Sequence, residues 1–270
     1  MGMTDAALKL LRRARTAGEI RAALDAVPTG AALRQTLTER YDELAAGPRR
    51  DPAANLRAEL LRGLRPMVSV ADRERLEAAL TTYEFGPQGE NCSGLRAAAL
   101  HALADLDPDL AETYAVHLLG DGHAEKMSGE PALSAVRFLA SRGATAPLFL
   151  YALQGGAGQE TLADAYRGLA GLPATLVARL AWRMLKSQDP VALVGLFDLL
   201  TSHPQPAAFG GFVTKWAIET DLIDVLQFAA AQAIATRCRP LIAALERAAE
   251  LAPQPERRTL IKEALGDQQI

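Results

Sequence analysis

Residues 94–120 read GLRAAALHALADLDPDLAETYAVHLLG, two apolar segments rich in Ala and Leu on either side of Asp107-Pro108. Ala and Leu favour an α-helix, and the β-branched runs that strands prefer are scarce along the chain. An Asp followed by Pro suits the residue that caps a helix and the first helical position after it. This stretch therefore predicts two helices with a break at Asp107.

The same arrangement recurs along the chain. In five segments a large apolar residue stands three positions before a leucine, at intervals of about 30 to 40 residues, and these leucines are Leu64, Leu103, Leu139, Leu169 and Leu200. After each segment comes a short break and a second apolar segment, at 71–83, 109–119, 146–153, 174–185 and 207–218. A helix pair cannot bury both of its faces alone, whereas stacked pairs complete a common core. We predict an all-α fold, an α-solenoid of stacked antiparallel helix pairs, with the five leucines buried.

The first 50 residues have helical periodicity but not the repeat. Leu33, Leu37, Tyr41 and Leu44 follow one helical stripe, for example. We therefore expect residues 1–50 to form an N-terminal helical cap region and residues 51–270 to form a single continuous solenoid. Two segments with several glycines, 84–93 and 120–130, are predicted as long loops between helices.

The repeat resembles a known family. Residues 95–103 follow the pattern Leu-Arg-x-x-Ala-x-x-Ala-Leu, and a second segment ends in Leu118-Leu119-Gly120-Asp121. This pair resembles a HEAT-like repeat of the short bacterial kind first described in phycobilisome lyases, and Asn55-Leu56-Arg57-Ala58 is similar to the start of the preceding unit. The resemblance covers 55–139 and is weaker over 140–250. It implies a solenoid in a family that includes scaffolds, regulators, lyase subunits and a group of DNA glycosylases.

Composition excludes several classes of protein. Hydrophobic residues make up 49% of the 270 residues and charged residues 23%, which is typical of a folded protein rather than a disordered one. The net charge of -3 argues against a basic nucleic-acid coat, and no uninterrupted apolar run is long enough for a membrane span. The N-terminus lacks the pattern of a signal peptide. We expect a cytoplasmic protein in which Cys92 and Cys238 are free thiols.

No set of residues predicts a reaction. His101, His117 and His123 fall within one repeat, but their spacing differs from that of a helical zinc pair, and the glycines match no phosphate-binding loop. Cys92 has no partner that would make it a nucleophile. We therefore expect no catalytic residue, no metal and no cofactor, and an enzyme is the less favoured class.

Five residues on the second helices are candidates for binding a partner: Tyr151, Arg179, Trp182, Arg183 and Trp216. Arg179 and Arg183 are four residues apart, so they share one helical stripe, and Trp182 lies beside it. Tryptophan and arginine are common in binding hot spots, and the second helices are expected to line a concave face. The alternative is that Trp182 belongs to the core and the arginines are solvated.

Basic residues outnumber acidic ones in residues 1–65. Arg50, Arg57, Arg62 and Arg65 form a cluster that is a candidate for binding an anion, although arginine side chains also solubilise helix surfaces. We predict a non-enzymatic binding or scaffold module for a protein or peptide partner. The alternatives are a nucleic-acid binding or repair protein of the HEAT-like glycosylase kind and a lyase-type enzyme subunit.

Overall fold

The structure is all-α. It is a computed structural model that describes residues 3–87, 89–123, 128–156 and 158–266. Among these residues the only strands are β1 (Phe85–Gly86) and β2 (Gly89–Glu90), which pair antiparallel with Phe85 opposite Glu90. This hairpin lies in segment 84–93, which was predicted as a loop. The prediction of an all-α fold is confirmed.

The chain divides into two compact units, Met1–Ala135 and Val136–Ile270. The boundary falls within helix α8 (Ala132–Ser141). The first unit contains α1 (Met3–Arg13), α2 (Ala17–Asp25), α3 (Ala31–Ala46), α4 (Asn55–Leu64), α5 (Arg73–Leu80), α6 (Ser93–Leu106) and α7 (Pro108–Leu119). The second contains α9 (Thr145–Gln154), α10 (Gln159–Arg167), α11 (Ala174–Arg183), α12 (Pro190–Ser202), α13 (Gly210–Glu219), α14 (Ile223–Ala235), α15 (Arg239–Leu251) and α16 (Pro255–Gly266).

Short 3₁₀ turns lie between several of these helices. They are η1 (Pro48–Arg50), η2 (Arg65–Met67), η3 (Val70–Asp72) and η4 (Pro206–Phe209). Two of them, η3 and η4, lie directly before α5 and α13, so the predicted segments 71–83 and 207–218 each contain a 3₁₀ turn followed by an α-helix.

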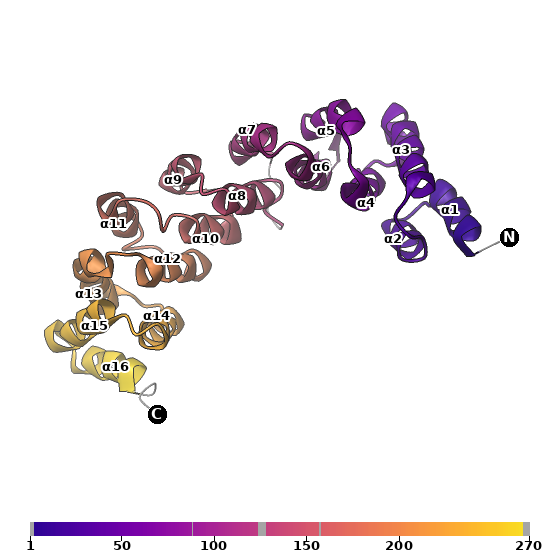
Figure 1. Cartoon of the computed structure of the whole chain (residues 1–270). Coiled ribbons are helices and arrows are strands. Elements are labelled where there is room, and N and C mark those ends of the chain that lie inside the picture. Colours follow the sequence, from indigo (N-terminus) through magenta and orange to yellow (C-terminus); the bar gives the residue numbers. More distant parts are fainter. Residues whose placement is uncertain (1–2, 88, 124–127, 157, 267–270) are drawn as a thin grey trace. The chain divides into compact units, whose positions relative to one another are not determined.

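In the first unit, α4 packs against both α3 and α6, and α6 also packs against α5 and α7 (Figure 1). The N-terminal helices belong to the same unit, because α1 contacts both α2 and α3, and α2 and α3 each contact α4. Alanines on α6 such as Ala98 and Ala99 are buried and let neighbouring helices approach closely.

In the second unit the helices form two rows (Figure 1). One row runs α10, α12, α14, α16 and the other runs α11, α13, α15, with each helix contacting the next in its row. The rows share a core in which Trp216 of α13 packs against Phe197 of α12 with ring centroids 4.6 Å apart. All five leucines predicted at the repeat positions are buried, as the periodicity required.

The chain has three Asp-Pro pairs, which begin at Asp51, Asp107 and Asp189, and two of them cap helices in the way expected for Asp107. The carboxylates of Asp107 and Asp189 accept hydrogen bonds from the backbone N–H of Leu110 and Ala192, at 3.1 and 3.0 Å. Asp51 differs, because α4 begins four residues later, at Asn55. The Asp51 carboxylate nevertheless accepts from the backbone N–H groups of Leu56 and Arg57, and so satisfies the first turn of α4 from outside the helix.

No described helix is long and apolar enough to cross a lipid bilayer.

Candidate functional site

The predicted anion cluster does not form a free basic surface. Arg50, Arg62 and Arg65 are exposed, and each lies next to a carboxylate, of Glu43, Glu59 and Asp105 respectively, at 2.6 to 2.8 Å. Arg57, the fourth member, is buried with 2% of its surface exposed. Every arginine of the cluster thus has an acidic partner, although Glu43 also pairs with Arg40 and Glu59 also pairs with Arg21.

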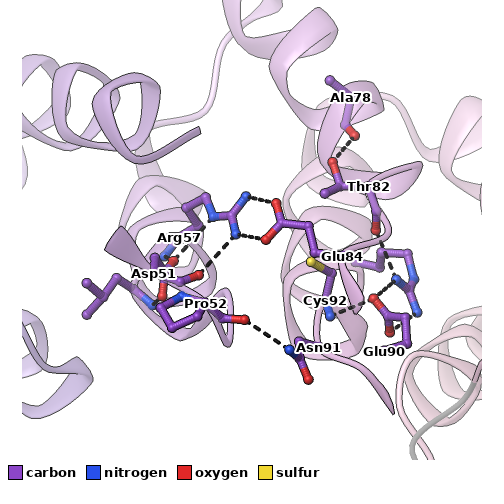
Figure 2. Close-up of polar contacts among 11 residues, drawn as sticks. Asp51, Pro52, Arg57, Ala78, Thr82, Glu84, Glu90, Asn91 and Cys92 are labelled. Carbon is purple, nitrogen blue, oxygen red and sulfur yellow. Dashed lines mark hydrogen bonds and ion pairs between the residues drawn. The ribbon is translucent and has the colours of Figure 1, made fainter. Parts of the chain in front are cut away.

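Arg57 is the centre of a buried ion-pair network (Figure 2). Its Nη1 and Nη2 donate to the two carboxylate oxygens of Glu84 at 2.6 and 2.7 Å, and its Nε donates to Asp51 at 3.2 Å. Asp51 precedes α4 and Glu84 follows α5, so the guanidinium joins three segments of the first unit. Beside it, the Asn91 amide donates to the carbonyl of Pro52 at 3.0 Å.

Arg96 repeats this arrangement one helix pair later. It is fully buried, and its Nη1 and Nη2 donate to Glu90 at 2.8 Å each, while Nη2 lies 3.0 Å from Asp121. The Thr82 carbonyl accepts from Nη1, and the guanidinium carbon lies 4.2 Å from the centroid of the Tyr83 ring. The backbone N–H of Cys92 donates to the Glu90 carboxylate at 2.6 Å (Figure 2).

The two networks share a sequence spacing. In each, one carboxylate stands six residues before the arginine, and a second follows the next helix of the chain: Asp51, Arg57 and Glu84 in one, Glu90, Arg96 and Asp121 in the other. Sequence reasoning missed this role. The signal was there, because both arginines occupy the same position of the Leu-Arg motif, near the start of α4 and of α6.

The electrostatics of these networks favour a structural role. Burial alone would lower the pKa of Arg57, but hydrogen bonds and charges from Glu84 and Asp51 outweigh it and raise the pKa. The same balance, with Glu90 and Asp121, raises the pKa of Arg96. Burial and the nearby Glu84 raise the pKa of the Cys92 thiol to about 11, so this thiol is neutral at physiological pH and a poor nucleophile.

The three histidines of the repeat lie in different surroundings. His101 Nε2 is 3.2 Å from the Ser134 hydroxyl, and burial followed by the charge of Arg65 lowers its pKa. His123 packs edge-on against Tyr83 and Phe85, and His117 is exposed on α7. Within residues 3–87, 89–123, 128–156 and 158–266, no group of three or more His, Cys, Asp or Glu could hold a metal ion.

The predicted partner-binding residues separate into two groups. Tyr151 is buried, and Trp216 has no exposed surface, so both belong to the core of the second unit. Arg179, Trp182 and Arg183 are exposed on α11, and 44% of Trp182 is accessible to solvent. The structure therefore brings three of the five predicted residues to one exposed part of a helix.

A lysine from α13, the neighbour of α11 in the same row of helices, joins this group. Lys215 of α13 has its Nζ 5.9 Å from the centroid of the Trp182 ring, and Phe212 of α13 packs edge-on against the same ring at 5.9 Å. We call Arg179, Trp182, Arg183 and Lys215 the α11–α13 face. The side chain of neither Arg179 nor Arg183 forms an ion pair or hydrogen bond with any residue that the structure describes.

The comparisons with known proteins find no match, whether to a protein-family model, a curated protein or a solved structure. The case for a function therefore rests on the geometry of the chain itself.

Proposed function

We propose that the protein is a non-enzymatic binding module, a HEAT-like α-solenoid, that holds an acidic segment of a partner protein on the α11–α13 face. The observation that carries the proposal is the exposed Trp182, which lies among three cations of which two have no acidic partner. Burying an exposed tryptophan against a partner removes a large apolar surface from water.

The contrast with other arginines of the second unit supports this site. Arg137 pairs with Asp164 at 2.7 Å, and Arg167 pairs with both Asp164 and Asp198 at 2.6 and 2.9 Å. The Arg137–Asp164 and Arg167–Asp198 pairs connect different helices. Arg179 and Arg183 make no such connection, so their charges are free to meet a ligand.

The charge of the α11–α13 face indicates what kind of partner fits. Arg179, Arg183 and Lys215 are positive, and one carboxylate, Glu219, lies 3.8 Å from Lys215. A segment with carboxylates on either side of an apolar residue would match the cations and cover the indole. A nucleic acid fits less well, because the chain carries a net charge of -3 and the arginines of residues 50–65 are already paired.

A defined peptide tests the proposal. A labelled peptide with Glu and Asp on both sides of a central Leu should bind, more weakly as salt rises, and its Gln and Asn counterpart should not. Arg179→Glu with Arg183→Glu should weaken binding by at least about tenfold. Arg239→Glu with Arg247→Glu, which changes the net charge equally on α15, should leave it within about twofold.

The melting temperature of both double variants is the control for folding. Equal losses of binding in the two variants would mean that only overall charge matters, and the proposal would be wrong. It would also be wrong if the Arg179 and Arg183 variant bound the peptide as the parent protein does.

A further inference from the structure

A cavity of about 580 Å³ lies in the second unit, between the C-terminal end of α13 and the N-terminal end of α16. Ile218, Pro253 and Leu260 form its apolar wall. Its polar wall carries three carboxylates, of Glu219, Asp221 and Glu256. A ligand that fills it would therefore meet both apolar surface and negative charge.

The one cation of the cavity, Arg257, is already committed to the fold. Its Nε and Nη2 both donate to the carbonyl of Ala217, at 2.8 and 2.6 Å, which ties α16 to α13. Burial lowers the pKa of Arg257, and the charge of Asp221 acts in the opposite direction. With Arg257 balanced by Asp221, two carboxylates remain in the wall.

The negative charges of the two remaining carboxylates, of Glu219 and Glu256, are only weakly compensated by nearby cations. Glu219 lies 3.8 Å from Lys215, and both side chains are largely exposed. Glu256 forms no ion pair with a described residue. The C-terminal end of α13 and the N-terminal end of α16 both line the cavity, and their partial charges are opposite in sign. The preference for a cation over an anion therefore rests on the carboxylates.

We propose that this cavity binds the cationic end and alkyl stem of an arginine or lysine side chain presented by a partner protein. The carboxylates pair with the charged group, and the apolar wall covers the methylene groups of the stem. The volume leaves room for the neighbouring backbone of the ligand as well as the side chain. The Lys215–Glu219 pair joins the cavity to the α11–α13 face, but the proposal does not depend on that face.

The test is a titration of the whole protein in which the backbone amide NMR signals of Thr220 and Gln254 report binding. The probes are N-acetylarginine methylamide, its neutral analogue N-acetylcitrulline methylamide, and spermidine. We expect the arginine probe to bind with a dissociation constant of about 1 mM and the citrulline probe to cause no change in these amide signals. Tighter binding of spermidine would assign the same cation site to a free polyamine rather than a side chain.

Paired variants locate the site. Glu219→Gln with Glu256→Gln should weaken binding of the arginine probe by about tenfold, whereas Glu246→Gln with Glu263→Gln should change it less than twofold. Trp182→Ala should leave it unchanged, which separates this result from the outcome at the α11–α13 face. Equal binding of arginine and citrulline probes, or equal effects of the two double variants, would overturn the proposal.

Discussion

Arg57 and Arg96 occupy equivalent positions in two successive helix pairs, and each is held by two carboxylates from outside its own helix. Forming a buried ion pair requires that both charges leave water, so such a pair adds little net stability over a well-packed apolar substitute. Breaking one is different, because the partner charge is then left buried and alone. These arginines therefore fix which segments lie together.

Replacing Arg57 by Ala should lower the free energy of unfolding by about 3–5 kcal/mol, because Asp51, which is 3% exposed, loses its cation. Arg65→Ala is the matched control. Arg65 and Asp105 are both about half exposed, so this change should cost no more than about 1 kcal/mol. Urea unfolding measures both values. Similar losses in the two variants would contradict a structural role that is specific to Arg57.

The raised pKa of Cys92 predicts its reactivity. With a pKa of about 11, the thiol has almost no thiolate at pH 8, and its side chain is buried. The native protein should therefore react slowly with a thiol reagent at pH 8, and the rate at Cys92 should rise toward pH 11. In urea both cysteines should react, giving two thiols per chain. Rapid labelling of Cys92 in the native protein would disprove its burial.

Helix α12 illustrates packing at the scale of one element. A methyl group at Gly195 would overlap the backbone of Ala163, so the glycine sets the close approach of α10 and α12. Gly195→Ala should therefore destabilise the protein, by about 1–3 kcal/mol. Gly211→Ala in α13 is the control, because no atom lies within 4 Å of its added methyl group. It should be neutral or stabilising by up to about 1 kcal/mol, as helix propensity requires. Thermal unfolding distinguishes the two outcomes.

The contact of His101 on α6 with Ser134 on α8 predicts a pH dependence. Burial favours the neutral ring and lowers the pKa of His101 in the folded state below its ordinary value near 6.5. Below pH 6.5 the unfolded chain protonates His101 more readily than the folded chain does. The contribution of the neutral His101 ring to stability is therefore complete above about pH 6.5, and it is lost as the pH falls toward the pKa of the folded state. His101→Gln should flatten the stability profile below pH 6.5. An unchanged slope would show that other groups cause it.

Across the whole molecule, apolar periodicity was enough to predict the helices but not every buried side chain. The burial of Leu103 and of its four counterparts was predicted correctly, because a leucine on the apolar stripe of a helix is usually buried. Trp182 and Trp216 could not be told apart from sequence, because both lie on second helices. Tertiary packing, such as that of Phe197 against Trp216, decides which of them is buried. Arg57 was assigned to the surface because its partner Glu84 is 27 residues away, beyond any local pattern.

The proposed repeat architecture also predicts how damage spreads through the chain. If each pair is stabilised mainly by its neighbours, a defect in one unit should weaken that unit first. Leu103→Ala removes a fully buried side chain from α6 and should cost about 2–5 kcal/mol. Hydrogen exchange should then show faster exchange in α4, α5, α6 and α7, whereas α10, α12 and α14 of the second unit keep their protection. The reciprocal variant, Leu200→Ala in α12, should reverse the pattern. Equal loss of protection in both units from either variant would mean that the chain unfolds as one cooperative body and that the repeats do not act as separable elements.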